Sequence, residues 1–328
     1  MTGGSPVHLD ARDAFIAPLR GWGRYALELT RCLPADLVTV HREGGAGPEV
    51  LWEQIGFPRA LRRAGARVVH APNCFLPLRR PCPGVVTIHD LAFEAYPGDF
   101  SRQTGLKYRF ITPRAARSAE RVICVSQSTA DDVSARYGVD AAKIRVIPNA
   151  PSLVIGDGAP PNGDDPYLLA VGDIRAKKNL ARLVEAWSGL RADGLTQRLV
   201  LAGQGDLPDG VPEGVQMTGY IGDAQLDALM RGADALVHPS LYEGFGLVVI
   251  EAMARGVPVA IADATSLPEV AGDAAERFDP LDTDDMAAAI LRALGRRDEL
   301  RTLGLARAAQ FSWEATAAAT ADVYRELL

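Results

Sequence analysis

No part of this 328-residue chain is apolar enough to cross a membrane, because no stretch approaches the roughly 18 consecutive apolar residues that a spanning helix needs. Its first residues also lack the basic and apolar regions of a signal peptide. Cysteine is scarce, and the thiols show neither a C-x-x-C pair nor a matched histidine spacing, so we expect them to be free and to bind no metal. They are Cys32, Cys74, Cys82 and Cys124. These absences together predict a cytoplasmic protein.

Basic charge is unevenly distributed along the chain, although the net charge is only −6. Residues 1–155 carry 20 Lys and Arg against 14 Asp and Glu, whereas residues 156–328 carry 15 against 27. At this length we expect two domains of about 150 residues each, so a basic first domain precedes an acidic second one. The basic domain would face something anionic. An uneven drift between two solvated surfaces is the alternative.

Short apolar segments alternate with longer segments of helical spacing in both halves. The segments that we expect to be strands are 67–71, 84–89, 121–126, 144–149, 167–172, 198–203, 235–239 and 257–262. Near-continuous apolar strands separated by helices, such as the one expected over 101–119, indicate parallel sheets that bind ligands beyond the carboxyl ends of their strands. The Gly, Pro, Asp and Asn residues clustered over 150–165 predict a domain boundary. A final helix over 315–328 could be capped by Ser312.

The most informative segment is 238–256, in which two acids stand eight residues apart. Glu243 lies in a polar loop beside Gly244 and Gly246, which would let the backbone approach a ligand closely. Glu251 opens an apolar run that predicts the first turns of a helix. A loop that leads into a helix N-terminus presents N–H groups suited to phosphate or sugar hydroxyls. The segment therefore predicts a nucleotide-sugar site.

A pair of glycines near the start of the chain has two interpretations. Gly21, Gly23 and Ala26 fit the G-x-G-x-x-A pattern of dinucleotide-binding folds, which would make the chain an oxidoreductase. Pro18, however, stands where the required strand should lead into the loop, which argues against that function. We therefore expect a glycine loop that opens a helix over 24–32 and offers N–H groups to a phosphate. A plain loop-to-helix turn is the alternative.

Polar residues follow several of the expected strands. His89 ends one of them, where it could hydrogen-bond a sugar hydroxyl or a developing charge, or be a satisfied structural residue. Lys177 and Lys178, two of only four lysines in the chain, follow another strand. They are suited to a diphosphate leaving group, although lysines before a helix are commonly just solvated. Glycine turns at 202–206 and 219–222 could bring the backbone against a nucleotide base.

Taken together, these motifs resemble glycosyltransferase family 4, whose members are retaining enzymes of the GT-B fold. The segment from Glu243 to Pro258 matches the family's E-x7-E signature at every usual position, and the supporting motifs occur in the expected order over nearly the whole chain. The pattern from His89 to Phe93, followed by Tyr96, is most similar to bacterial mannosyltransferases of surface-polysaccharide assembly.

The resemblance implies an α/β protein with two Rossmann-like, doubly wound parallel-sheet domains that face each other across a cleft. Residues 1–152 would form the acceptor-side domain, and residues 153–311 would form the nucleotide-sugar-binding domain. A C-terminal helix over 312–328 would cross back to complete the first domain.

The resemblance also implies roles for individual residues. Lys178, with Arg175 beside it, would neutralise the donor diphosphate, and Glu251 would hydrogen-bond the ribose hydroxyls. Glu243 would lie against the donor sugar, and His89 would contact that sugar near the reacting carbon. The implied catalytic residues are His89, Glu243 and Lys178. Further implied contacts around the nucleotide and its phosphates are Gly21, Gly23, Gly203, Tyr220, Phe245, Gly246 and Leu247.

Two positions depart from the family pattern. Asp173 stands where many members carry an arginine, five residues before the phosphate-binding lysine. Arg175 or Lys177 could replace that charge. Ala150 follows Asn149 where glycine is usual, which could stiffen the hinge between the domains.

The implied reaction moves a hexose, mannose favoured, from a nucleoside-diphosphate sugar to a hydroxyl of a glycan, lipid-linked or small-molecule acceptor. GDP-mannose is the favoured donor, a UDP-sugar is the alternative, and no cofactor would be tightly bound. No D-x-D motif follows a strand, so Lys178 and helix N-termini would stabilise the leaving group without a metal. The acceptor hydroxyl would attack the sugar from the same face that the diphosphate leaves, which retains the anomeric configuration. The alternative mechanism uses Glu243 as a covalent nucleophile. The competing function is a catalytically inactive GT-B-like nucleotide-binding partner protein, and no nucleic-acid partner is expected.

One stretch of the basic domain predicts a further partner. Residues 100–121 carry six basic side chains against the single acid Glu120, with aromatic and aliphatic residues interleaved. Such a helix can lie at an anionic membrane surface or bind the phosphates of a lipid-linked sugar. The protein would then be peripheral at the inner face of the membrane. A core-facing apolar stripe with a solvated basic face is the alternative.

Overall fold

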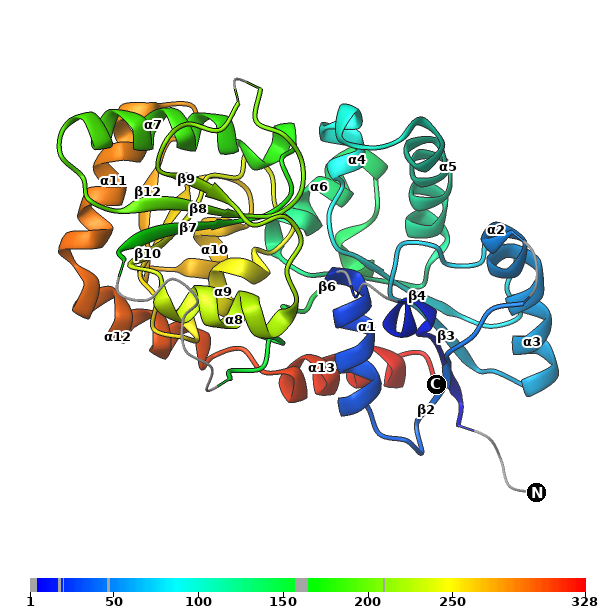
Figure 1. The fold of residues 1–328 in the computed structure, drawn as a ribbon. Helices are drawn as coiled ribbons and strands as arrows, with labels where there is room; N and C mark the ends of the chain where they lie inside the picture. Colours follow the sequence, from blue (N-terminus) through cyan, green and yellow to red (C-terminus); the bar gives the residue numbers. More distant parts are fainter. Residues whose placement is uncertain (1–4, 17–18, 20, 46–47, 157–164, 209) are drawn as a thin grey trace. The chain divides into compact units, whose positions relative to one another are not determined.

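The computed structural model describes residues 5–16, 19, 21–45, 48–156, 165–208 and 210–328. The chain divides into two compact units, one formed by residues 1–150 with 311–328 and the other by residues 151–310 (Figure 1). Each unit contains a parallel six-stranded sheet, which confirms the predicted α/β class with two doubly wound sheets. Pro18 and the segment 157–164 of the predicted domain boundary lie outside the described residues.

The sheet of the first unit has the strand order β2-β1-β3-β4-β5-β6, with parallel neighbours throughout. Its strands are β1 (Val7–Asp10), β2 (Val38–His41), β3 (Val68–Ala71), β4 (Gly84–Ile88), β5 (Arg121–Cys124) and β6 (Ile144–Val146). From β1 the chain first builds toward one edge and then, from β3, toward the other. The sheet therefore has its topological switch point between β1 and β3, where sheets of this kind bind ligands.

Helices cover both faces of this sheet because successive strand residues point to opposite sides. Val85 belongs to a core cluster with residues of α1 (Gly21–Cys32) and α13 (Trp313–Arg325), whereas Val86 belongs to a cluster on the other face. That second cluster includes residues of α3 (Phe57–Ala64), α5 (Arg102–Ser118) and α6 (Gln127–Tyr137). The shorter elements are η1 (Arg12–Phe15), α2 (Glu49–Leu51), η2 (Trp52–Gly56), α4 (Ala92–Ala95), η3 (Pro97–Asp99) and η4 (Ala141–Lys143).

The C-terminal helix α13 packs beside α1 and completes the first unit (Figure 1). Ser312 caps it as expected, because its Oγ accepts a hydrogen bond from the backbone N–H of Ala315 at 3.1 Å. A buried polar network joins the helix to the sheet: the Tyr324 hydroxyl lies 2.6 Å from Nδ1 of His70, whose Nε2 lies 2.8 Å from Oγ1 of Thr87. These bonds satisfy polar groups that would otherwise be costly to bury.

The predicted loop before the first helix is wrong. Helix α1 begins at Gly21 rather than at residue 24, so both glycines lie in its first turn. Gly23 is buried, and a β-carbon there would come within 2.6 Å of the backbone oxygen of Asp13. Gly23 therefore allows α1 to pack closely against η1. At Gly21 a β-carbon would meet no heavy atom within 4 Å, so the backbone is open to approach.

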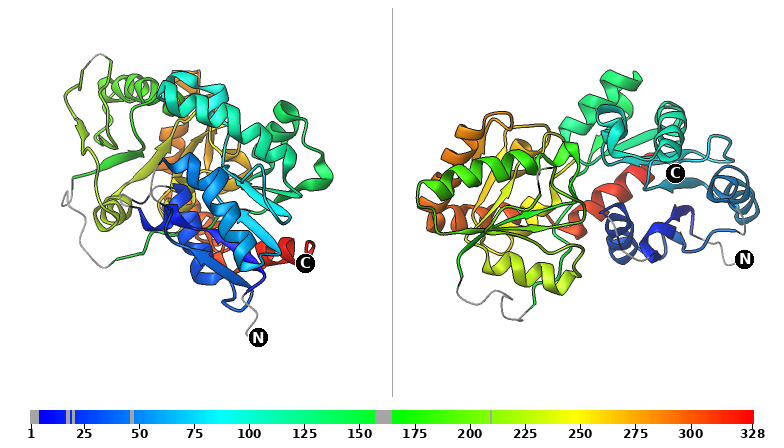
Figure 2. Two further views of the ribbon diagram at one scale, coloured as in Figure 1. Left: turned by 90° about the vertical axis from the view of Figure 1, so that its right-hand side faces the viewer. Right: turned by 45° about the horizontal axis from the view of Figure 1, so that its top comes forward.

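The sheet of the second unit has the strand order β12-β11-β10-β7-β8-β9, also parallel. Its strands are β7 (Tyr167–Val171), β8 (Arg198–Ala202), β9 (Val215–Met217), β10 (Ala235–His238), β11 (Val259–Ala262) and β12 (Glu276–Phe278). The switch point lies between β7 and β10. Helices α7 (Leu180–Ala192) and α11 (Thr283–Gly295) cover one face, and α8 (Asp223–Gly232) and α9 (Leu247–Met253) cover the other (Figure 2).

The remaining elements of the second unit are η5 (Ala176–Lys178), α10 (Leu267–Ala271) and α12 (Arg297–Ala308). Among the described residues, no helix of either unit is long and apolar enough to cross a membrane.

Candidate active site

Two loops meet at the switch point of the second unit, beyond the carboxyl ends of β7 and β10. Asn179 ties them together from a left-handed backbone conformation with φ of 56°. Its Nδ2 donates to the backbone oxygen of Pro239 in the loop after β10, at 3.1 Å, and also to that of Pro280, which follows β12, at 2.7 Å. The backbone N–H of Leu241 also donates to the oxygen of Lys177 at 2.8 Å. The two loops are thus held in fixed register.

These loops bring Lys178 and Glu243 into an ion pair in which Nζ donates to Oε1. His238, the last residue of β10, places its Nε2 3.1 Å from the same oxygen, and Oγ of Ser240 lies 3.2 Å from that nitrogen. The backbone of Glu243 is also fixed, because its N–H donates to Oγ1 of Thr265 at 3.0 Å. The sequence identified Lys178 and Glu243 but missed His238, which contacts the same oxygen of Glu243.

The electrostatics of this cluster keep Glu243 ionised. Burial by itself disfavours the charged carboxylate, but the ammonium of Lys178 and the hydrogen bond from His238 hold the pKa of Glu243 well below its usual range. Burial lowers the pKa of His238, although Glu243 opposes that shift. At neutral pH the cluster is therefore a carboxylate with one ammonium and one neutral imidazole, so Glu243 cannot act as a proton donor.

Close backbone packing joins the loops that follow β7 and β8. A β-carbon at Gly203 would come within 2.1 Å of the backbone oxygen of Gly172, so only glycine fits there. Asp173 bridges the same loops, because its Oδ1 accepts from the N–H of Gln204 at 3.1 Å. Arg175 donates to the other oxygen of Asp173 at 3.3 Å. The acid that replaces the family's arginine thus holds a neighbouring arginine.

The loop after Glu243 leads into α9, which begins at Leu247 and not, as predicted, at Glu251. Gly246 precedes it with φ of 100°, and a β-carbon there would lie 2.8 Å from Cδ2 of Leu267. Phe245 is buried. Tyr220, predicted to lie near the nucleotide base, has 63% of its surface exposed in the loop after β9.

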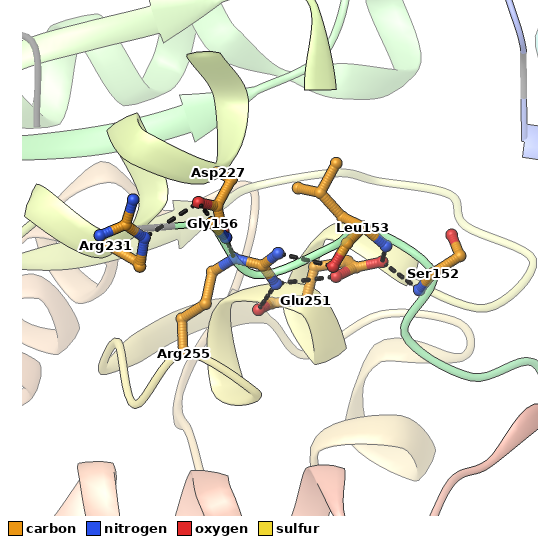
Figure 3. Close-up of polar contacts among 7 residues, drawn as sticks. All are labelled: Ser152, Leu153, Gly156, Asp227, Arg231, Glu251 and Arg255. Carbon is orange, nitrogen blue, oxygen red and sulfur yellow. Dashed lines mark hydrogen bonds and ion pairs between the residues drawn. The ribbon is translucent and has the colours of Figure 1, made fainter. Parts of the chain in front are cut away.

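Glu251 lies in the second turn of α9 and is buried (Figure 3). Its Oε1 accepts hydrogen bonds from the backbone N–H groups of Ser152, at 2.6 Å, and Leu153, at 2.7 Å. Its Oε2 accepts from Nη1 of Arg255 at 2.8 Å. Glu251, which was predicted to bind the ribose, therefore holds the first residues of the second unit in this structure.

Arg255 is the centre of this network and has no exposed side-chain surface. Its Nε donates to Oδ1 of Asp227 and its Nη2 to the backbone oxygen of Leu153, both at 2.8 Å (Figure 3). Asp227 also accepts from Arg231 at 2.9 Å and from the N–H of Gly156 at 3.0 Å. Sequence reasoning missed this network, although Arg255 follows Glu251 by four residues, in the turn just after α9, and this spacing favours an ion pair at a helix end.

His89 lies in the first unit, just beyond β4. Its Nε2 donates to the backbone oxygen of Pro72 at 2.8 Å, and its ring meets the ring of Tyr25 edge to face, with centroids 4.9 Å apart. Burial lowers its pKa, against the effect of the Pro72 bond and of the charge of Asp90. The neutral imidazole, protonated at Nε2, leaves Nδ1 as a hydrogen-bond acceptor.

The predicted site residues therefore fall into three groups in the structure. Lys178 and Glu243 contact each other directly, Glu251 belongs to a separate network, and His89 lies in the first unit together with Gly21 and Gly23. Among the described residues, no group of three or more His, Cys, Asp or Glu side chains is arranged to hold a metal ion.

Two family models match the chain: "Glycosyl transferases group 1" over residues 157–306 and "Glycosyltransferase Family 4" over residues 37–151. The O-antigen chain mannosyltransferase B of Escherichia coli is 31% identical, with 82% of this chain and 76% of the relative covered. The MMP alpha-(1->4)-mannosyltransferase of Mycolicibacterium hassiacum is 28% identical, with 89% and 78% covered.

Solved structures agree with these sequence matches. Sucrose-phosphate synthase from Thermosynechococcus elongatus superposes with a TM-score of 0.74 at 23% identity, covering 98% of this chain and 99% of the other. Anabaena HepE, solved in complex with UDP, superposes with a TM-score of 0.71 at 19% identity, covering 98% and 100%. Together with the group 1 model, these matches confirm the predicted GT-B fold.

Proposed function

Because this chain belongs to glycosyltransferase family 4, we propose that it moves mannose from GDP-mannose to a hydroxyl of a glycan acceptor, with retention of configuration and without a metal. The observation that carries this proposal is the Lys178–Glu243–His238 cluster at the switch point of the second sheet. It sets an ammonium beside a fixed carboxylate where doubly wound sheets bind nucleotides. Family membership disfavours both the oxidoreductase and the inactive-partner alternatives.

The cluster explains how the reaction could proceed. The departing diphosphate gains negative charge in the transition state, and the ammonium of Lys178, preoriented by Glu243, would stabilise it. The acceptor hydroxyl would attack from the same face and pass its proton to the departing phosphate oxygen. Glu243 is a poor candidate for a covalent nucleophile, because Lys178 and His238 lower its pKa well below the usual range and so weaken it as a nucleophile. Its role would be to position the lysine and contact the donor sugar.

The other predicted ligands keep their proposed roles. In the second unit, backbone N–H groups at the start of α9 would bind the phosphate and sugar hydroxyls, and Glu251, oriented by Arg255, would accept from the ribose hydroxyls. These backbone groups belong to Phe245, Gly246 and Leu247, and the nucleotide contacts would come from Arg175, Gly203 and Tyr220. In the first unit, Nδ1 of His89 would accept from a sugar hydroxyl, and the backbone at Gly21 would admit a phosphate.

We expect the transferred hexose to keep the anomeric configuration of the donor, and EDTA to leave turnover unchanged. The enzyme is incubated with GDP-mannose and a mannose-terminated oligosaccharide, with and without EDTA. Proton NMR of the early product then gives both the anomeric configuration and the rate. A parallel incubation with UDP-glucose tests the donor, and we expect GDP-mannose to be turned over faster. An inverted anomeric centre would overturn the mechanism, whereas a preference for the UDP-sugar would overturn only the donor assignment.

Helix α5 carries a second proposal, that the enzyme binds peripherally at the inner face of the membrane. Leu106 and Phe110 are 62% and 58% exposed on this helix. Several of its basic groups bond to the protein itself: Arg109 donates to the backbone oxygen of Phe93, and Arg117 to that of Tyr137. The exposed apolar pair would therefore contribute more to membrane contact than net charge would.

Replacing both Leu106 and Phe110 with serine is expected to reduce co-sedimentation with anionic vesicles by at least about tenfold, because two large apolar side chains no longer insert. Leu305→Ser, at an exposed site on α12, is the matched control and should bind like the wild type. Binding should weaken as salt is added. Absence of wild-type binding at low salt, or equal binding of the double variant, would exclude α5 as a membrane contact.

A further inference from the structure

The first unit has a cavity of about 350 Å³. Its lining includes Asp13, just beyond β1, and Asn73, just beyond β3. The cavity therefore lies at the switch point of the first sheet, the position where doubly wound sheets bind ligands. Its volume is within the range of small-molecule sites.

Aromatic rings form one part of the cavity wall. Phe75 and Tyr108 meet edge to face with centroids 4.7 Å apart, and the indole of Trp22 lies at the rim with 39% of its surface exposed. Nζ of Lys107 lies over the ring of Phe75, 4.0 Å from its centroid, so the exposed indole of Trp22 is the surface that suits the C–H face of a pyranose ring. The wall therefore favours a sugar over a purely polar ligand.

Fixed polar groups complete the wall. Nδ2 of Asn73 donates to Oδ2 of Asp13 at 2.6 Å, so the two side chains hold each other in place. This arrangement leaves Oδ1 of Asp13 as a carboxylate acceptor for hydroxyl groups. Pro72, whose oxygen accepts from His89, immediately precedes Asn73. His89 is not in the described lining, but its imidazole is thus hydrogen-bonded to the residue that precedes Asn73.

The charge of the cavity argues against an anionic ligand. Lys107 is the one basic residue in its described lining, and its Nζ lies 2.7 Å from Glu49 and 3.3 Å from Glu53. Glu49 and Asp13 line the cavity as well. Lys107 is thus already paired with Glu49, and the carboxylate of Asp13 leaves the described lining with a net negative charge, so a phosphate would meet no free cation.

We infer that this cavity binds a neutral sugar unit of the acceptor and rejects a phosphorylated sugar or a lipid phosphate. The inference rests on the proposed function, since it assigns the acceptor of the same transfer. The basic charge of the first domain suggested an anionic partner. The negative charge around this cavity instead favours a neutral acceptor sugar.

A saturation-transfer NMR titration tests the inference with two probes, α-linked mannobiose and mannose 6-phosphate. We expect the wild type to bind mannobiose saturably and mannose 6-phosphate at least about tenfold more weakly. Trp22→Ala should weaken mannobiose binding about tenfold, because one stacking face is lost. Phe15→Ala, a matched exposed ring two residues from Asp13 and outside the cavity lining, should not change it. The double variant Asp13→Asn with Glu49→Gln should reduce the difference in affinity between mannobiose and mannose 6-phosphate, because it removes two carboxylates from the lining.

The thermal shift produced by GDP separates this inference from the proposed function. Every variant should keep that shift, since none of the substituted residues lies in the second unit. Equal or tighter binding of mannose 6-phosphate, or unchanged mannobiose binding by Trp22→Ala, would overturn the cavity assignment while leaving transfer from GDP-mannose intact. Mannobiose binding at the cavity without any hexose transfer would instead overturn the proposed function.

Discussion

Replacing Arg255 with methionine is expected to lower the free energy of unfolding of the second unit by about 3–5 kcal/mol. The guanidinium lies between the carboxylates of Asp227 and Glu251, with no exposed side-chain surface of its own. Methionine has a similar length but no charge, so two buried carboxylates would lose their shared cation. The backbone oxygen of Leu153 would also lose its donor. Urea unfolding followed by far-UV circular dichroism measures the loss.

Arg231 provides the matched control, because it pairs with the same Asp227 but keeps 23% of its side chain exposed. Arg231→Met should therefore cost about 1 kcal/mol or less. Adding Asp227→Asn and Glu251→Gln to Arg255→Met should recover part of the stability, since neutral amides tolerate the lost cation better than carboxylates do. If Arg255→Met proved no more destabilising than Arg231→Met, the buried network would not be what holds residues 152–156 in place.

The same network bears on nucleotide binding. One oxygen of Glu251 already accepts two backbone N–H groups, and the other accepts from Arg255. A ribose hydroxyl would therefore meet a carboxylate whose position is fixed before the nucleotide arrives, which reduces the cost of ordering on binding. Loss of Arg255 would therefore reduce the stability of the second unit more than it reduces nucleotide affinity.

Much of the fold could be predicted because most strands inside the two sheets are buried on both faces, although β1, which is equally buried, was not predicted. β4, β5, β7 and β8 are short, near-continuous apolar runs, which is the pattern of a parallel sheet. The edge strands β9 and β12 are only three residues long and include exposed polar side chains, so they show no such pattern. Their place is set by pairing with β8 and β11, which the local sequence does not encode.

Both misplaced helices begin earlier than predicted, and packing is the cause in each case. Glycine is a poor helix former, so Gly21 and Gly23 suggested a loop. The tight packing of α1 beneath the backbone oxygen of Asp13 overrides that preference. The start of α9 was predicted at Glu251, but the helix also includes Val249 and Ile250, whose burial outweighs the low helix propensity of β-branched residues.

The sequence identified residues of the candidate site but not the contacts between them. The motif identified Lys178 and Glu243, but their pairing across 65 positions depends on the strand order, which brings β7 beside β10. His238 ends an apolar strand in the same way as His89 does, yet only the folded chain shows that it contacts Glu243. Long-range polar contacts of this kind follow from topology rather than from spacing.

Removing the ammonium group of Lys178 is expected to give the largest catalytic effect. Lys178→Ala should lower kcat/KM for hexose transfer by on the order of 10²-fold or more, because the charge of the leaving diphosphate grows in the transition state. The fall should appear mainly in kcat, with little change in KM for the donor. Initial rates at varied GDP-mannose concentration measure both constants. Lys178→Arg keeps the charge with a different shape and should recover part of the rate.

The loss has to be separated from a simple effect on the fold, since Lys178→Ala also leaves Glu243 without its buried partner. Lys177→Ala is the matched control: it removes the same charge one residue away, and it should lower kcat/KM less than about fivefold, because a more distant charge is screened. Melting temperature and the thermal shift with GDP report folding and nucleotide binding separately from turnover. Rates for Lys178→Ala within about threefold of wild type would exclude the proposed diphosphate contact, because an ammonium beside the leaving group contributes well above that factor. If instead the rate of Lys178→Ala fell only in step with its melting temperature, and arginine restored both, Lys178 would act chiefly by compensating the buried charge of Glu243.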